Sequence, residues 1–333
     1  MMNDRPIVIA GAGSIGCFVG GMLARANRPV RFLVRPRIAA EIEANGLRLS
    51  SFEGLDERID AGKLGLSQAS SVFANAAIVL VTVKSSDTPE IAGLIARHAP
   101  PDAVIVSLQN GVGNATLLRQ HLPGRAVLAG MVPFNVLAVG EGRYHRATSG
   151  DILIDADQAG TAAKLSVPGL GVKPHADMTG IQWGKLLVNL NNALNALSDL
   201  PLRDQLAQRA WRSLFADQMA EGLLVLKAAG IHPVATTPLP ASWTPSILRL
   251  PDALFQIVAK PMVKIDPKAR SSMWEDLTRG RRTEIDHLQG MIIALSAKHG
   301  VTAPLSGRIV ALIRDAEAAG KGPPGLTPQQ VRG

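Results

Sequence analysis

Short apolar runs alternate with amphipathic segments along the first half of the chain. Runs typical of buried strands occupy residues 6–10, 30–34, 76–83, 103–108 and 126–132, and a last strand is expected at 151–156. Segments with the apolar spacing of helices lie between several of these runs, at 15–26, 37–45 and 89–98. Strands that alternate with helices favour an α/β fold with a parallel, doubly wound sheet.

The second half follows a different pattern, in which helical spacing dominates. The segments with this spacing are 181–200, 204–229, 283–299 and 306–319. We therefore predict a doubly wound α/β domain over residues 1–176 and an all-helical domain over residues 177–320. The glycine- and proline-rich end of the chain, residues 321–333, is expected to form a loose tail.

Composition narrows the classes of partner. The chain has 333 residues, a formal net charge of +8 and only 4% aromatic residues. The positive charge is spread along the chain and the aromatic residues do not alternate with basic ones, so we expect no nucleic-acid partner. A mild positive field favours small anionic ligands instead.

Other features bear on the compartment and on metals. No run of 18 apolar residues is present, so we expect no membrane partner, and the first residues lack the layout of a secretory signal. The single cysteine, Cys17, cannot form an internal disulfide, which favours a cytoplasmic protein. The seven histidines form neither an H-E-x-x-H motif nor a cluster with cysteine, so no metal site is expected.

A glycine-rich motif follows the first predicted strand and opens a predicted helix. It consists of Gly11, Ala12, Gly13, Ser14, Ile15 and Gly16 and matches the dinucleotide-binding pattern G-x-G-x-x-G. In this pattern the glycines permit a tight turn, close approach of a pyrophosphate and close packing of helix on strand. The N–H groups at the start of the helix are donors for the phosphates. The motif therefore predicts that the first domain is a Rossmann-type cofactor domain.

The end of the second strand indicates which dinucleotide is bound. NAD enzymes usually carry an acid there, whereas this chain has Arg35 followed by Arg37. Two arginines suit a 2′-phosphate, so the predicted cofactor is NADP, used as NADPH. Lys84 and Asn110 follow two later strands, and ligands of such sheets bind at the carboxyl ends of strands. Both residues are therefore candidates for the cofactor site.

Polar residues also interrupt the apolar helical half. Lys185 and Asn189 share one helix face, and Asn192 lies near it. Buried polar groups need partners, so this stripe indicates either a binding site or a solvated face. Glu284 lies near the start of a predicted helix, where an acid can act on the helix dipole alone.

In combination, these motifs resemble the ketopantoate reductase family (2-dehydropantoate 2-reductases). The resemblance covers nearly the whole chain and rests on GAGSIG followed by Arg35, then on VTVKSSD, QNGVGN, WGKLLVN, SSMWEDL and RRTEIDHLQG. It implies an N-terminal Rossmann-type domain, a C-terminal helical domain and an active site between them. The implied reaction is the NADPH-dependent reduction of a 2-keto acid to the 2-hydroxy acid in pantothenate and coenzyme A synthesis.

The resemblance also implies roles for individual residues. Lys185 matches the catalytic lysine, whose ammonium stabilises the developing alkoxide and donates a proton, and Glu284 matches the acid near that lysine. The resemblance places substrate contacts at Asn110, Asn189 and Ser272, with Ser272 near the carboxylate, and cofactor contacts at Asn110 and Lys84.

One position departs from the family pattern. Members that make pantoate commonly carry an asparagine eight residues after the lysine, where this chain has Ala193. Asn192 precedes it and is the remaining candidate for a substrate contact, but a helix turns by about 100° per residue. Ketopantoate is the predicted substrate, and two alternatives stay open: another branched 2-keto acid, and a non-catalytic NADP-binding sensor. A helical second half is also compatible with a homodimer.

Overall fold

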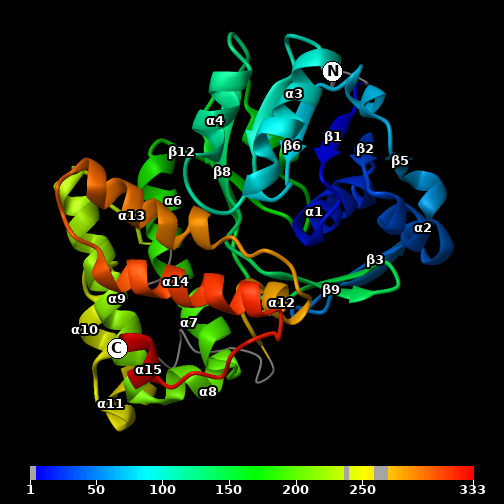
Figure 1. Ribbon diagram of the computed structural model, residues 1–333. Helices are drawn as coiled ribbons and strands as arrows, with labels where there is room; N and C mark the ends of the chain where they lie inside the picture. Colours follow the sequence, from blue (N-terminus) through cyan, green and yellow to red (C-terminus); the bar gives the residue numbers. More distant parts are fainter. Residues whose placement is uncertain (1–4, 236–239, 259–268) are drawn as a thin grey trace. The chain divides into compact units, whose positions relative to one another are not determined.

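A computed structural model describes residues 5–235, 240–258 and 269–333 of the chain (Figure 1). The chain forms two compact units, Met1–Met178 (unit 1) and Thr179–Gly333 (unit 2). Strands and helices alternate in unit 1, whereas every regular element in the described part of unit 2 is a helix. This composition of elements confirms the predicted fold class.

Unit 1 is built on an eight-stranded sheet. From one edge to the other its strands are β12 (Val172–His175), β11 (Ile152–Asp155), β8 (Val127–Met131), β7 (Val104–Ser107), β6 (Ile78–Val81), β1 (Ile7–Ala10), β2 (Val30–Leu33) and β5 (Gly65–Ser67). The central strands β1 and β6 are buried along their whole length, which explains their uninterrupted apolar sequences.

The six strands from β5 to β8 are parallel and have the order of a doubly wound dinucleotide-binding sheet. Their register places Ala10 opposite both Leu33 and Val81, and Val81 opposite Ser107. The loops that follow β1, β2, β6 and β7 therefore all leave the sheet on the side where its parallel strands have their carboxyl ends. The strand order reverses between β1 and β6, and such a reversal is where these sheets bind ligands.

The far edge of this sheet differs from the prediction of a fully parallel sheet. Strand β11 runs antiparallel to β8, with Ile154 opposite Gly130, and β12 is an additional strand parallel to β11. The chain passes from β8 to β11 without a crossover helix, and only such a crossover would return it parallel. The pattern of apolar residues does not predict β12, because its sequence, VKPH, is short and polar and contains a proline. Within sheets, proline occurs mainly in edge strands.

A second sheet in unit 1 was not predicted at all. Its strands, in order, are β4 (Asp56–Ile59), β3 (Leu47–Ser51), β10 (Arg143–Arg146) and β9 (Val136–Gly140). In β3, Leu47 and Leu49 are buried while Arg48 between them is exposed. Such alternation gives a half-buried strand a weak apolar signal, since every second residue faces solvent.

The helices of unit 1 cover these sheets. They are α1 (Ser14–Arg25), α2 (Pro36–Asn45), α3 (Thr88–His98), α4 (Asn114–His121) and α5 (Thr161–Leu165), with short 3-10 turns η1 (Ala61–Lys63), η2 (Ser70–Phe73) and η3 (Ser85–Asp87). Helix α1 packs against β1 and β2 of the large sheet and against β3, β9 and β10 of the small one. Phe18 on α1 meets Phe134 edge to face, with ring centroids 5.8 Å apart. The main core of unit 1 is thus centred on α1.

Unit 2 is a helical bundle. Its helices are α6 (Met178–Asn189), α7 (Asn191–Ser198), α8 (Leu202–Ala207), α9 (Arg209–Ala228), α10 (Thr244–Leu248), α11 (Asp252–Val258), α12 (Ser272–Thr278), α13 (Gln289–Lys298), α14 (Pro304–Ala319) and α15 (Pro328–Arg332), with one 3-10 turn, η4 (Ile285–His287). The long helix α9 packs against α8, α10, α13, α14 and α15 and forms the centre of the bundle.

Two predicted long helices are each split in two. The segment 181–200 forms α6 and α7, which are separated at Leu190, and the segment 204–229 forms α8 and α9. The side-chain amide of Gln289 donates a hydrogen bond of 2.9 Å to the carbonyl of Leu190. Because this contact comes from a distant part of the chain, local apolar spacing cannot show it.

The segment 283–299 also differs from the predicted single helix. Residues Ile285–His287 form only the 3-10 turn η4, and α13 begins at Gln289. Leu288 has φ −114° and ψ −89°, which is not helical and separates the two elements. Glu284 therefore lies on an irregular segment that precedes the helix, and the expectation of an acid acting on a helix dipole is wrong.

The C-terminal residues are not a loose tail. Helix α15 packs against α9 and α14, and Val331 is completely buried. The N–H of Leu326 donates to the carbonyl of Leu197 at 2.8 Å, and Arg332 forms an ion pair with Asp217 of α9. Thr327 and Gln330 form a reciprocal capping box at the start of α15. The glycines and prolines of this segment thus shape an ordered connection.

Candidate active site

The glycine motif forms a tight turn between β1 and α1. Gly11 has φ +109°, and a Cβ there would lie 2.7 Å from the Val83 side chain. A Cβ on Gly16 would lie 2.2 Å from the carbonyl oxygen of Gly11. The hydroxyl of Thr82, just after β6, donates to that same oxygen at 2.5 Å. Thr82, which sequence reasoning missed, therefore fixes the turn at the point where the strand order reverses.

The same turn is open on the side that a ligand would approach. A Cβ on Gly13 would meet no atom within 4 Å, and no side chain caps α1 at this residue. The N–H groups of the first helical turn, which begins at Ser14, are consequently not capped by a side chain. Unpaired N–H groups at a helix start bind phosphate well, so these residues fit a dinucleotide pyrophosphate. Ala12 lies in this turn, and Ile15 lies in the first turn of α1.

Arg35 follows β2, on the side of the sheet where the parallel strands have their carboxyl ends. Its guanidinium lies 3.3 Å from the carboxylate of Asp87, and its side chain is 86% exposed. Arg37 forms a comparable pair with Glu41 on α2, at 3.4 Å. Exposed ion pairs of this kind contribute little to stability, so each guanidinium can exchange its carboxylate partner for a ligand. Arg35 is thus an exposed cation just after β2.

Lys84 and Asn110 follow β6 and β7 and are both exposed. A buried network joins their two loops. The carbonyl of Asn110 accepts hydrogen bonds from Ser85 at 3.1 Å and from the Asn114 side chain at 2.8 Å. Thr88 connects Asn114 to Gln109 through bonds of 3.1 and 2.8 Å. Ser85, Thr88, Gln109 and Asn114 are supporting residues that sequence reasoning missed, although polar residues directly after buried strands signal them.

Lys185 is the central residue of the candidate site in unit 2. It lies on α6, and the residue as a whole is partly buried. Burial lowers the pKa of Lys185 to about 8, and the nearby carboxylate of Glu284 partly offsets that effect. A lysine with a pKa near neutrality can both hold and release a proton under physiological conditions.

Glu284 reaches this lysine from a segment distant in sequence. It immediately precedes η4 and is partly buried. Its negative charge raises the pKa of Lys185 and so opposes the effect of burial. Asn189, one helical turn after Lys185, is the last residue of α6 and is also partly buried.

Ser272 and Asn192 come from two packed helices of unit 2. Ser272 is the exposed first residue of α12, whereas its buried neighbour Ser271 caps that helix by accepting from the N–H of Trp274 at 3.1 Å. The Ser271 hydroxyl donates to the carbonyl of Asn192 at 2.9 Å. The N–H of Ser271 donates to the side chain of Asn195 at 2.8 Å. Ser271 and Asn195, both missed from sequence, thus hold the start of α12 beside α7.

Ala193 is completely buried, whereas Asn192 is partly exposed. The structure therefore gives these adjacent residues opposite environments. An alanine cannot replace the hydrogen bonds of an asparagine side chain. The departure expected from the sequence at Ala193 stays a prediction.

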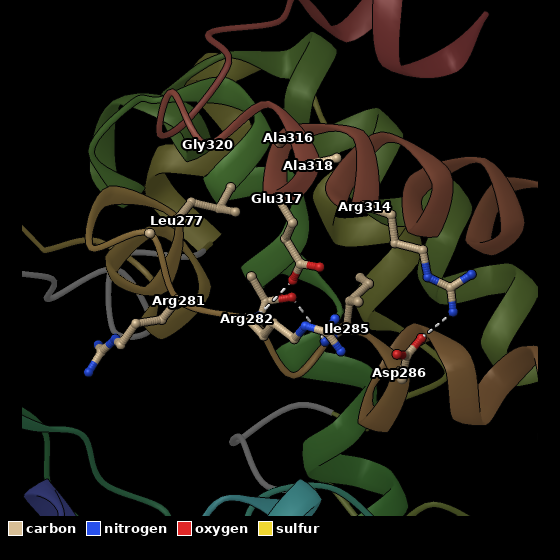
Figure 2. Close-up of a pocket in the computed structure, with 12 residues that line it drawn as sticks. Leu277, Arg281, Arg282, Ile285, Asp286, Arg314, Ala316, Glu317, Ala318 and Gly320 are labelled. Carbon is tan, nitrogen blue, oxygen red and sulfur yellow. Dashed lines mark hydrogen bonds and ion pairs between the residues drawn. The ribbon is translucent and has the colours of Figure 1, made fainter.

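A cavity of about 490 Å³ lies elsewhere in unit 2, between the end of α14 and the segment before η4 (Figure 2). Its lining consists of Leu277, Gly280, Arg281, Arg282, Thr283, Ile285, Asp286, Arg314, Ala316, Glu317, Ala318 and Gly320. None of the predicted catalytic or substrate-binding residues lines it. It borders the backbone on either side of Glu284.

Three further findings concern reactivity, membranes and metals. Burial raises the pKa of the Cys17 thiol to about 12, so it stays protonated and unreactive. In the described ranges no helix is long and apolar enough to cross a bilayer. Nor do three or more His, Cys, Asp or Glu side chains gather as metal ligands anywhere in the part of the chain that the structure describes.

Comparison with known families decides the assignment. The model of "Ketopantoate reductase PanE/ApbA" matches residues 7–158, and the model of its C-terminal domain matches residues 177–317. The chain belongs to the ketopantoate reductase family. The resemblance found in the sequence motifs is thereby confirmed.

Individual relatives agree with this assignment. A PanE/ApbA family ketopantoate reductase from Ralstonia eutropha JMP134 is 32% identical, with a TM-score of 0.81 over 95% of this chain and 99% of that one. The 2-dehydropantoate 2-reductase of Halobacterium salinarum is 28% identical over 94% of this chain and 99% of its own length. A D-mandelate dehydrogenase complex with NADH and anilino(oxo)acetate is 20% identical, with a TM-score of 0.79 over 95% of this chain and 99% of that one, and shares the fold.

Membership of the ketopantoate reductase family establishes the class of reaction. The protein is an oxidoreductase that acts on a CH–OH group, as predicted. The family uses NADPH, which confirms the predicted cofactor. The glycine turn and Arg35 at the sheet edge are residues that fit this group.

Proposed function

We propose that this protein reduces 2-dehydropantoate (ketopantoate) to pantoate with NADPH, and that Lys185 is the general acid. The observation that carries the proposal is the environment of Lys185, whose burial lowers its pKa to about 8 beside the carboxylate of Glu284. A sensor that only binds NADPH needs neither a tuned proton donor nor a partner acid. The names of the curated relatives support the choice of substrate.

The chemistry follows from charge development on the substrate. The chemistry that bound NADPH would supply is transfer of a hydride to the keto carbon, which would leave negative charge on the oxygen. The ammonium of Lys185 stabilises that oxygen and transfers a proton to it, which gives the hydroxyl group. The charge of Glu284 raises the pKa of Lys185 and so favours the protonated lysine at neutral pH.

The remaining candidates orient the reactants. We assign the Ser272 hydroxyl to the substrate carboxylate, and the amides of Asn189 and Asn192 to other polar groups of the substrate. In unit 1 the motif Gly11–Gly16 would hold the pyrophosphate and Arg35 the 2′-phosphate. Lys84 would contact the cofactor, and Asn110 would contact cofactor and substrate. Such positioning is where much of the rate enhancement arises.

One observation favours a second candidate substrate. Ala193, buried in α7, lacks the amide that pantoate-forming members commonly carry at this position. A site that loses a hydrogen-bonding side chain discriminates less between a hydroxylated substrate and an apolar one. The alternative is therefore a reductase of another branched 2-keto acid that forms the D-2-hydroxy acid.

Two further expectations belong to this proposal. We propose that the enzyme acts in the cytoplasm, in pantothenate and coenzyme A synthesis. We also propose that it forms a homodimer. A Staphylococcus aureus ketopantoate reductase with the same fold, described as dimeric, supports this proposal.

The test is NADPH oxidation by the purified protein with ketopantoate and a panel of branched 2-keto acids. We expect the highest kcat/KM with ketopantoate, and a 10²–10⁴-fold loss of kcat in Lys185→Ala with NADPH binding retained. Lys298→Ala, an exposed lysine on α13, is the matched control. A higher kcat/KM with another keto acid would contradict ketopantoate as the substrate and leave the proposed role of Lys185 in place. Binding of NADPH without turnover on any substrate would contradict the proposal.

A further inference from the structure

Glu284 is held by a segment that lacks regular structure. The segment 280–284 lies between the end of α12 and the short turn η4. The cavity of about 490 Å³ lies along this segment, and its lining includes Arg314 and Glu317 of α14 (Figure 2). Contacts to the backbone of this segment therefore contribute to the position of the carboxylate that it carries.

Two side chains of α14 make those contacts. The Glu317 carboxylate accepts a hydrogen bond of 2.7 Å from the backbone N–H of Thr283. Arg314 donates to the carboxylate of Asp286 at 2.7 Å. Figure 2 shows Glu317 and Arg314 projecting from the same helix toward this segment. They are three residues apart and share one helix face, so together they hold the chain on either side of Glu284.

The two contacts are not equally strong. The side chains of Arg314 and Asp286 are 60% and 62% exposed. Exposed ion pairs contribute little to the stability of the folded chain. Glu317 is partly buried, and a carboxylate that accepts from a backbone N–H forms one of the stronger kinds of hydrogen bond. Its bond is also one residue away from Glu284. Glu317 is therefore the more important of the two.

We propose that Glu317 is a positioning residue, which fixes Glu284 beside Lys185 through its bond to the Thr283 backbone. This inference rests on the proposed function, because it assumes that Glu284 acts on Lys185. The consequence lies in proton transfer. When Glu317 is removed, Glu284 moves away from the lysine, and the ammonium loses the charge that favours it.

Other charged groups of this region must be considered in any test by pH. They are Arg281, which pairs with Asp276, together with Arg282, Asp286 and Arg314. Arginine keeps its charge throughout the range in which a lysine of this kind titrates. Because histidines ordinarily titrate at about pH 6.5, a change in the pH dependence between pH 8 and 10 reports on Lys185 and not on His287 of η4.

The experiment compares Glu317→Ala with Glu317→Gln, using the full chain and NADPH. Glu317→Ala is expected to lower kcat about tenfold and to leave the KM for NADPH unchanged. Its rate of keto-acid reduction should also fall at a lower pH than that of the parent. Glu317→Gln keeps an oxygen that accepts from the Thr283 N–H, so it should restore most of both properties.

Controls separate positioning from folding. Asp315→Ala removes an exposed acid from the same turn of α14 and should behave as the parent. Glu317→Asp shortens the side chain and keeps its charge, so it tests the inference if Glu317→Ala fails to fold. It should show a smaller loss of kcat with a pH shift in the same direction. Unchanged kcat and pH dependence in the folded variants would overturn the inference.

Glu284→Gln distinguishes this inference from the proposed function. If Glu284→Gln leaves the pH dependence of reduction unchanged, the role proposed for Glu284 is wrong. If Glu284→Gln shifts it and Glu317→Ala does not, the proposed function stands and the positioning role of Glu317 is wrong.

Discussion

At the scale of single residues, the environment of Lys185 matters most. Burial disfavours its ammonium form, while the carboxylate of Glu284 favours it, and burial is the larger effect. The balance brings the pKa from its ordinary value of 10.5 to about 8. Both protonation states are therefore within reach of mild conditions, which suits a reversible proton transfer.

This balance predicts opposite pH dependences for the two directions of reaction. Reduction needs the protonated lysine, so its rate should fall as the pH rises above about 8. Oxidation of the hydroxy acid needs the neutral lysine, so its rate should rise through the same pH. Initial rates between pH 6 and 10 measure both. Reduction that stays constant to pH 10 would contradict the role of Lys185 as the acid.

Arg35 carries the second residue-scale prediction. Arg35→Ala should raise the KM for NADPH by at least tenfold and leave the KM for NADH nearly unchanged, because only NADPH has a 2′-phosphate. Arg37→Ala is the matched control and should have a smaller effect, since Arg37 lies within α2 and Arg35 lies nearer the end of β2. Equal use of both cofactors by the parent protein would exclude this form of cofactor selection.

At the scale of elements, Arg212 organises one end of the helical bundle. Its side chain is completely buried on α9 and donates to the carbonyls of Leu206, Ala207, Leu248 and Leu250 at 2.9–3.1 Å. The guanidinium also pairs with Asp252 at 2.7 Å and lies 4.2 Å from the Phe255 ring. One arginine thus joins the end of α8 to the loops around α10 and α11.

We therefore expect Arg212→Ala to lower the free energy of unfolding by about 3–5 kcal/mol, because it leaves a cavity and several buried carbonyls without donors. Arg212→Lys should recover little, since three donors cannot replace a planar group with five. Denaturant unfolding measures both. Arg209→Ala, an exposed arginine of the same helix, should cost less than about 1 kcal/mol. A similar loss in both alanine variants would contradict this account.

The elements that the sequence predicts best are those with a complete apolar pattern. Strands β1 and β6 are buried throughout, and their apolar runs predict them directly. The small sheet was missed because strands such as β3 alternate buried leucines with exposed polar residues. The splits at Leu190 and Leu288 depend on distant contacts or on local backbone angles, which apolar spacing does not encode.

The candidate site was more predictable than its supports. The glycine motif, Arg35 and Lys185 stand out because their residue types are unusual in their setting. Thr82 and Glu317 do not, since a threonine after a strand and a glutamate on a helix are ordinary. Their importance follows only from which backbone groups they contact.

At the scale of the whole molecule, the end of the chain closes the bundle of unit 2. Helix α15 covers parts of α9 and α14, and Arg308 on α14 donates to the carbonyls of Val331 and Gln330 at 2.7 and 2.8 Å. Val331 therefore belongs to the bundle core, and hydrogen bonds hold the residues around it. Their order depends on contacts with α9 and α14, which come earlier in the chain.

Removal of residues 321–333 should consequently destabilise the protein. We expect a loss of about 2–4 kcal/mol in the free energy of unfolding, because the truncation exposes apolar surface and removes the pair between Arg332 and Asp217. Thermal unfolding measures the change. Val331→Ala, which removes two buried methyl groups, should give a smaller loss of about 1–2 kcal/mol. A truncated protein as stable as the parent would contradict the packing of α15.

The burial of Lys185 has a consequence for attempts to raise the thermal stability of this protein. A lysine whose pKa falls on folding weakens the folded state at neutral pH, and this penalty disappears only as the pH rises from about 8 toward 10.5. Lys185→Met should therefore raise the melting temperature at pH 7, and the gain should shrink in alkali. A selection for heat resistance alone would favour this change and yield a robust but inert protein.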